Sequence, residues 1–120
     1  QSVLYATERR AFGRNIGQFQ VVRHQLAEMA TKTASARAFV SVTAARFRDG
    51  EQVTTDVAMA KNAAVEACSF VTDTAVQIHG GMGYMRESLV ERLYRDARVY
   101  PIGGGTTEIM RELIGRSLIG

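Results

Sequence analysis

Apolar residues recur at three- and four-residue spacing along most of the chain, and glycines interrupt this pattern at a few points. The longest such stretch runs from Gln18 to Arg48 and ends at an Asp49-Gly50 turn. Its apolar face comprises Val22, Leu26, Met29, Thr33, Ala36, Val40 and Phe47. This spacing predicts an amphipathic helix about 45 Å long. Because a lone helix is marginally stable in water, it needs packing partners along its length.

A second long helix is predicted to end at the glycine pair Gly80-Gly81. Thr54 or Thr55 is the expected N-terminal cap, with Asp56 in the first turn. The apolar seam of this helix comprises Val57, Ala60, Ala64, Cys68, Val71, Ala75 and Ile78. The small residues in the seam allow another helix to approach closely.

The remaining stretches predict shorter helices. Residues Gln1–Ala11 resemble the end of a helix that begins upstream, since nothing at Gln1 resembles a cap. Two further helices are expected over Glu87–Ala97 and Thr106–Leu118. Val99–Ile102 has no second strand to pair with, and the chain shows no hairpin signal. We therefore predict an all-α fold, an up-and-down four-helix bundle with a truncated first helix, formed by residues 1–120 as one domain.

Composition narrows the class of protein. Of the 120 residues, 46% are apolar and 22% are charged, which is ordinary for a globular domain and excludes a disordered tail. No apolar run of about 18 residues is present, so we expect no membrane span, and no signal peptide is visible. The net charge is +3, without a run of like charges. A nucleic-acid-binding bundle is a weak alternative, suggested only by the arginine content. Cys68 is the single cysteine, which fits a reducing compartment.

Three segments carry candidate chemistry, and each also has a plain structural interpretation. Gln77–Tyr84 is either a helix C-cap or a glycine turn whose backbone N–H groups approach a phosphate. Gly103–Glu108 is either a capping turn or a helix start that binds a polar ligand. Arg9–Gln20 is either an exposed basic helix end or a grip on a diphosphate, with Phe12 stacked on a planar ring.

Metal binding and nucleophilic catalysis are not expected. His24 and Glu28 lie four residues apart on one helix face, but a metal site needs more ligands than this pair. Cys68 lies on the apolar seam, where a cysteine is usually a small core residue. No Ser-His-Asp arrangement with its supporting turns is present.

In order and spacing, these segments resemble the C-terminal helical domain of the acyl-CoA dehydrogenases across essentially all 120 residues. The matching motifs are Arg9-x-Ala11-Phe12-Gly13, Ile16-x-x-Phe19-Gln20, Gln77-Ile78-His79-Gly80-Gly81-x-Gly83-Tyr84, Arg95-Asp96-Ala97-Arg98 and Ile102-x-x-Gly105-Thr106-x-Glu108-Ile109. Each motif is weak alone, but five in register are specific. The pattern is most similar to long-chain and isovaleryl-type members.

The resemblance implies which residues contact FAD and substrate. The implied FAD contacts are Arg9, Phe12, Gln20, Gln77, Gly80, Gly81, Thr106, Thr107 and Glu108. Gly104 and Gly105 match the segment beside the substrate thioester. In the family the cofactor lies between subunits, and the arginine matched by Arg9 reaches the FAD diphosphate of the neighbouring subunit.

The resemblance also implies an activity. Family enzymes oxidise an acyl-CoA to its trans-2-enoyl form, transfer hydride to FAD and pass electrons to an electron-transfer flavoprotein, in fatty acid beta-oxidation and lipid metabolism. They are usually homo-oligomers, so we expect a dimer or tetramer. The expected location is a bacterial cytoplasm or the mitochondrial matrix.

One departure concerns catalysis. Many family members carry the catalytic glutamate at the position of Gly104, which cannot take a proton, so we expect no catalytic residue in this chain. In a subset of the family the base lies on the helix that precedes the Arg9-x-Ala11-Phe12-Gly13 motif, upstream of Gln1. We therefore predict no turnover by this chain alone, and an apolar groove beside the truncated helix. The alternative function is a non-enzymatic helical interaction domain that kept the fold.

Overall fold

The computed structural model describes residues 1–120, and helices account for most of them. The helices are α1 (Ser2–Glu8), α2 (Gln20–Arg48), α3 (Thr54–His79), α4 (Gly81–Tyr84), α5 (Leu89–Ala97) and α6 (Thr107–Ile119), with a 3-10 turn η1 (Ile16–Gln18). Two-residue strands β1 (Arg10–Ala11) and β2 (Arg14–Asn15) form an antiparallel hairpin. The all-α prediction is confirmed.

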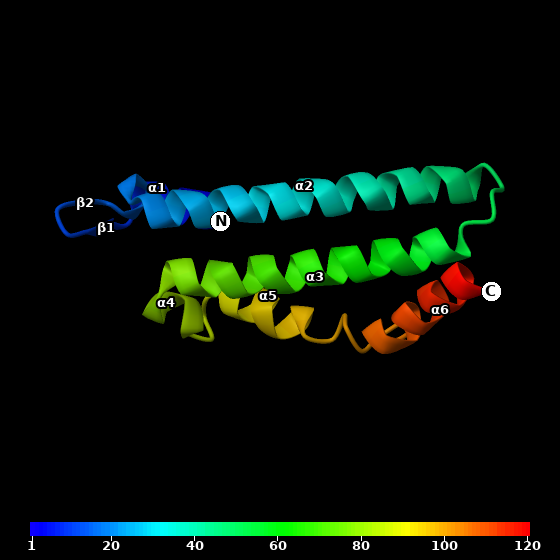
Figure 1. The fold of residues 1–120 in the computed structure, drawn as a ribbon. Helices are drawn as coiled ribbons and strands as arrows, with labels where there is room; N and C mark the ends of the chain where they lie inside the picture. The colour runs from blue at the N-terminus through cyan, green and yellow to red at the C-terminus, as the bar shows by residue number, and fades with distance from the viewer.

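The two long helices are antiparallel neighbours, and α3 is the central element (Figure 1). It packs against α2 on one side and against α5 and α6 on another. Helices α5 and α6 follow one another along α3, so together they fill the fourth position of the bundle. The first position is held by the short α1. The up-and-down arrangement with a short first helix is therefore confirmed.

Two local expectations are wrong. The β1–β2 hairpin was not predicted, because two-residue strands carry no alternating apolar pattern. Helix α3 begins after Val53, and no side chain caps it, so neither Thr54 nor Thr55 is its cap. Asp56 lies in the first turn as expected, and Gly80 ends the helix with a φ of +58°, which favours glycine.

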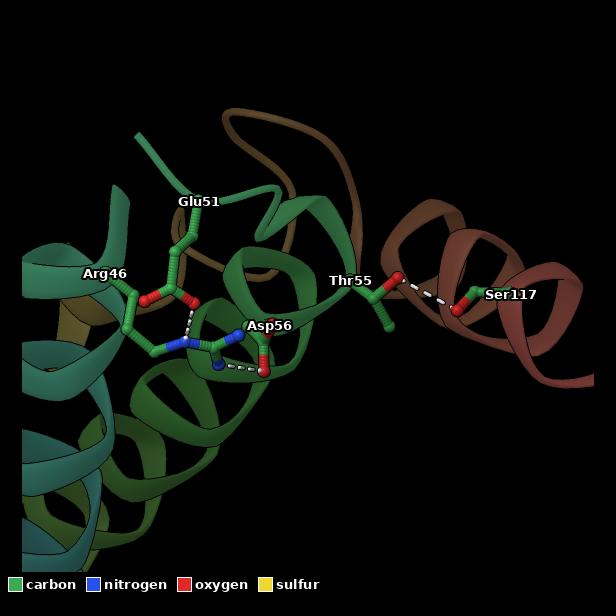
Figure 2. Close-up of polar contacts among 5 residues, drawn as sticks. All are labelled: Arg46, Glu51, Thr55, Asp56 and Ser117. Atoms are coloured by element: carbon green, nitrogen blue, oxygen red, sulfur yellow. Dashed lines mark hydrogen bonds and ion pairs between the residues drawn. The ribbon is translucent and has the colours of Figure 1, made fainter. Parts of the chain in front are cut away.

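Side-chain contacts connect the start of α3 to its neighbours (Figure 2). The Thr55 hydroxyl donates to the Ser117 hydroxyl at 2.9 Å and so joins α3 to α6. Arg46 contacts the Glu51 carboxylate at 2.8 Å and the Asp56 carboxylate at 3.1 Å. The hydrogen bond to Glu51, together with the charge of Asp56, raises the pKa of Arg46.

The core is thin. The buried apolar residues are Ala6, Met29, Val53, Ala58, Ala60, Ala67, Ala75, Ile78, Val90 and Ala97, and no large side chain is completely buried. The radius of gyration is 17.4 Å, against about 14 Å for a compact domain of this length. The predicted seam is only partly buried: Ala60, Ala75 and Ile78 are buried, whereas Val57 is exposed.

An apolar groove runs beside the N-terminal end of the chain, as predicted. It has a volume of about 510 Å³ and lies between α1, α2, α3 and α5. Leu26, Met29, Val71 and Leu93 form part of its walls, and Gln1 lies at its edge. No helix in the structure combines the length and the hydropathy needed to cross a membrane.

Candidate functional site

The residues expected to contact FAD or the substrate fall into two groups in the structure. The hairpin-end cluster lies where the hairpin, the start of α2 and the α3–α4 junction meet, at the left of Figure 1. Its members are Arg9, Phe12, Gln20, Gln77, Gly80 and Gly81. The loop cluster lies between α5 and α6 and at the start of α6. Its members are Gly104, Gly105, Thr106, Thr107 and Glu108.

The two clusters are separate on one copy of the chain. The loop cluster lies beside Lys61 of α3, whose ammonium donates to the Gly105 carbonyl. Gln77 of the hairpin-end cluster is about 24 Å further along the same helix. No single side chain spans that distance, so the two clusters are distinct places on the surface of one copy of the chain.

Arg9 and the glycine pair come together in one shallow hollow of about 590 Å³. Helix α1 ends at Glu8 because Arg9 is extended, and the Arg9 carbonyl accepts a hydrogen bond from the Ile16 N–H at 2.8 Å. This contact closes the base of the hairpin, and Arg9 lines the hollow together with Gly80 and Gly81. No atom lies within 4 Å of the position that a Cβ would occupy at either glycine, so a ligand can approach this backbone closely.

The hairpin concentrates positive charge without neutralising it. None of the six ion pairs in the structure involves Arg9, Arg10 or Arg14. Arg10 donates to the Gly13 carbonyl at 3.1 Å, and the Arg14 guanidinium lies over the Phe19 ring at 4.0 Å. A hollow with a free guanidinium and open glycine backbone suits an anionic group such as a diphosphate.

Phe12 and Gln20 extend this cluster outward. Phe12 is 95% exposed at the hairpin tip, with a φ of +51° and an edge-on contact to Phe19 at 6.2 Å between ring centroids. Gln20 is exposed at the start of α2, and its Nε2 lies 3.3 Å from the His24 Nε2. Gln77 is exposed near the end of α3. All three side chains are accessible to a ligand.

His79 is a residue of this hollow that the sequence interpretation did not single out. It is 7% exposed, and its ring stacks on the Tyr5 ring with centroids 4.2 Å apart. Its Nδ1 lies 2.7 Å from the Ala75 carbonyl, which accepts the proton of that nitrogen, and its Nε2 is buried without a partner. The sequence signal that could have identified His79 is its position inside the Gln77–Tyr84 motif.

The loop cluster is built on two glycines with positive φ and a helix start. Gly104 has a φ of +63° and Gly105 a φ of +89°. The Thr106 hydroxyl caps α6 by accepting the Ile109 N–H at 3.2 Å. The Thr107 N–H donates to the Pro101 carbonyl at 3.0 Å, and its hydroxyl lies 3.5 Å from the same oxygen, so Thr107 faces the loop.

Glu108 makes the start of α6 a poor place for an anion. A hydrogen bond from its own backbone N–H, and a second from the Thr106 hydroxyl, hold the pKa of Glu108 below its usual value. The carboxylate therefore stays charged and occupies the donors that a phosphate would need. This cluster suits a ligand group with hydroxyl or amide donors.

Gly104 also lines a cleft of about 740 Å³ between the α2–α3 turn, α3 and α6. Glu51 is a carboxylate in the same cleft, and Arg46 already pairs with it at 2.8 Å. Glu8 is exposed at the end of α1. Neither position offers a general base that is clearly poised for catalysis.

His24 and Glu28 have different partners in the structure: the His24 Nε2 lies 3.3 Å from the Gln20 Nε2. Glu28 contacts Lys32 at 3.8 Å, and no group of three or more His, Cys, Asp or Glu side chains is placed to hold a metal ion. Cys68 is half-buried, and burial raises the pKa of its thiol.

Comparisons with known proteins identify the family of this chain. The family model "Acyl-CoA dehydrogenase, C-terminal domain" matches residues 1–119. The chain is 45% identical over 118 residues to an acryloyl-CoA reductase (NADH) of Anaerotignum propionicum, covering 98% of this chain and 30% of the relative. It is 40% identical to the caffeyl-CoA reductase-Etf complex subunit CarC of Acetobacterium woodii, covering 99% of this chain and 31% of the relative. It is 43% identical to the mitochondrial long-chain specific acyl-CoA dehydrogenase of Sus scrofa, covering 96% of this chain and 27% of the relative.

Solved structures show the same similarity. An acyl-CoA dehydrogenase from Geobacillus kaustophilus is 41% identical with a TM-score of 0.96, covering 99% of this chain and 31% of that one. An FAD complex of PigA is 28% identical with a TM-score of 0.92, covering 98% and 30%. The chain therefore belongs to the acyl-CoA dehydrogenase family and matches its C-terminal domain. It spans about a third of the length of the curated relatives it matches.

Proposed function

We propose that residues 1–120 form the C-terminal FAD-binding and oligomerisation domain of an acyl-CoA oxidoreductase. The observation that carries the proposal is the convergence of Arg9 with the open backbone of Gly80 and Gly81 in one hollow, without an acidic partner for the guanidinium. The FAD complex of a 28%-identical structure supports FAD as the ligand.

The chemistry of the two clusters suggests how they divide the cofactor. The hairpin-end cluster binds the diphosphate and the adenosine side of FAD, with Arg9 as the cation and Phe12 as the stacking ring. Phe12 and Gln20 are exposed, so they reach outward to a cofactor held mainly by another copy of the chain. The loop cluster, where Glu108 excludes anions, contacts the uncharged part of the cofactor through Thr106 and the acyl-CoA thioester through Gly104 and Gly105.

The proposed reaction is the oxidation of an acyl-CoA to its trans-2-enoyl form. The chemistry that FAD supplies in such enzymes is acceptance of a hydride from the β-carbon. This chain contributes binding and orientation, and the base that removes the α-proton comes from outside it, because Gly104 has no side chain. Fatty acid beta-oxidation is the corresponding process.

Names of relatives bear on the direction of the reaction and on the partners. Two of them are reductases, so enoyl-CoA reduction is the second candidate activity. The name of CarC includes an Etf complex, which supports an electron-transfer flavoprotein as the electron partner. We further propose a homo-oligomer, a dimer or tetramer, in a bacterial cytoplasm or the mitochondrial matrix.

The test of the cofactor site compares Arg9→Met with Arg92→Met in the protein at its natural length. Arg92 lies exposed on α5, away from both clusters, and controls for the loss of one positive charge. A charge-assisted pair is worth about 1.5–3 kcal/mol, so FAD affinity falls tenfold to hundredfold in Arg9→Met alone. The measurement is a fluorescence titration of the stripped protein with FAD. Wild-type protein that takes up no FAD contradicts the proposal.

Activity is measured separately with mixed acyl-CoAs, added FAD and an artificial electron acceptor, and in reverse with enoyl-CoAs and a reductant. The natural-length protein is expected to turn over in at least one direction, and residues 1–120 alone in neither. A natural-length protein that binds no FAD and has no turnover favours the alternative, a helical interaction domain. Turnover by residues 1–120 above a protein-free control contradicts the expectation that the base lies elsewhere.

A further inference from the structure

The segment between α5 and α6 holds two glycines in left-handed conformations, yet it has a defined path. Hydrogen bonds within the segment join the Ile102 and Gly103 N–H groups to the Val99 carbonyl at 2.9 and 2.8 Å. A further one joins the Thr107 N–H to the Pro101 carbonyl at 3.0 Å. All of these are local, so they shape the segment without fixing it to the rest of the molecule.

Two neighbouring residues of α3 provide the connection to the helical frame. The Lys61 ammonium donates to the Gly105 carbonyl and to the Tyr100 carbonyl, the latter at 3.4 Å. The Asn62 side-chain amide lies 3.5 Å from the Thr107 carbonyl. Lys61 therefore binds the chain on both sides of Gly104: at Tyr100, before the three glycines 103–105, and at Gly105, the last of them.

Lys61 is unusual among the cations of this chain. The protein has two lysines against thirteen arginines. Lys61 is half-buried and takes part in none of the six ion pairs, so backbone carbonyls are its partners. Hydrogen bonds from a charged donor are stronger than neutral ones, which suits a contact that must hold a glycine-rich segment.

We propose that Lys61 is a positioning residue for the substrate side of the site: by binding the Tyr100 and Gly105 carbonyls it fixes Gly104 and the start of α6. The inference rests on the proposed function, which places Gly104 and Gly105 beside the thioester. It also accounts for the position of Lys61, which lines the same cleft as Gly104. A displacement of about 1 Å at such a point costs on the order of a hundredfold in rate.

The test uses Lys61→Met, Lys61→Arg and the control Arg92→Met in the natural-length protein. Methionine keeps the apolar stem and removes the charged donor. Arginine keeps a donor and a charge. The first measurement is amide hydrogen exchange over residues 99–108, with α2 and α3 as internal references. The second is the division of the rate effect between kcat and KM, with flavin content measured on the same samples.

We expect Lys61→Met to exchange at least about tenfold faster over residues 99–108 while α2 and α3 keep wild-type protection. Its kcat falls by about a hundredfold with unchanged flavin content, and Lys61→Arg recovers part of both effects. Unchanged exchange and unchanged kcat in Lys61→Met overturn the proposal. So does faster exchange throughout α2 and α3, because it shows a general structural role.

The exchange experiment separates this proposal from the proposed function. If the wild-type protein shows neither flavin nor turnover, the proposed function fails, and the positioning role of Lys61 in catalysis fails with it. Local loss of protection in Lys61→Met together with normal kcat overturns the positioning role in catalysis while leaving the enzyme assignment intact.

Discussion

Phe12 combines an exposed aromatic ring with a backbone conformation that costs energy. Its φ of +51° lies in the left-handed region, which costs a residue with a side chain roughly 1–2 kcal/mol. The ring is 95% exposed, and its contact with Phe19 is edge-on. Strain of this kind persists where the surroundings over-determine it, often at a ligand contact. The hairpin therefore presents the ring outward at an energetic cost to its own chain.

Comparing two substitutions at Phe12 isolates the energetic cost of its left-handed backbone conformation. Phe12→Ala and Phe12→Gly both remove the ring, but only glycine adopts the left-handed conformation freely. We expect Phe12→Gly to be more stable than Phe12→Ala by about 1 kcal/mol, measured as the free energy of unfolding in urea. Both variants lose FAD affinity to a similar extent. Equal stability of the two variants contradicts the assignment of strain to Phe12.

At the level of elements, the periodicity of apolar residues predicted the long helices closely. Helix α2 begins at Gln20 where Gln18 was expected, and it ends at Arg48 as predicted. The pattern works there because one face must pack on α3 along most of its length. The hairpin was missed because its two-residue strands carry no alternating apolar pattern, and short-range contacts such as that of the Ile16 N–H with the Arg9 carbonyl shape it instead.

Only part of the candidate site could be predicted from the sequence. Motifs and the family resemblance named its residues, including Arg9 and Gly80-Gly81, which the fold then brought into one hollow. Spacing alone could not show that these lie far from Thr106 on the same chain. Lys61 was missed because its partners are backbone carbonyls about 40 residues away, and carbonyls leave no signature in the sequence.

The start of α6 gives a pH-dependent contribution to stability. The pKa of Glu108 is depressed in the folded protein, so the unfolded state binds more protons in acid and folding is favoured above the ordinary carboxyl pKa. This contribution is complete near neutral pH and is lost as pH falls through the folded pKa, below about pH 4. We expect Glu108→Gln to lower Tm at neutral pH and to match wild type in acid.

The control for this prediction removes the hydroxyl that bonds to the carboxylate. In a Thr106→Ala background the pH-dependent effect of Glu108→Gln on Tm becomes smaller, because one cause of the shifted pKa is gone. Tm is followed by circular dichroism at several pH values. A constant Tm difference across the whole range contradicts the role of Glu108 ionisation.

At the scale of the whole molecule, this chain has too little core for its length. Its dimensions are 59 × 25 × 24 Å, and large apolar side chains such as Phe47 and Val42 are 70% and 58% exposed. Monomeric proteins seldom expose large contiguous apolar patches. The apolar groove beside α1 adds to the exposed apolar surface. Burial of these surfaces against other protein is the physical reason to expect an oligomer.

Residues 1–120 expressed alone are therefore expected to associate. Light scattering after size exclusion should give a mass above 13.2 kDa, and Leu93→Glu should shift it toward that value because Leu93 lines the groove. Leu118→Glu is the matched control: Leu118 is 76% exposed near the C-terminal end, outside the groove. A charge in the groove must be desolvated when a partner covers it, whereas a charge at Leu118 stays in water. Equal effects of the two substitutions place the association elsewhere, and a wild-type mass of 13.2 kDa contradicts it.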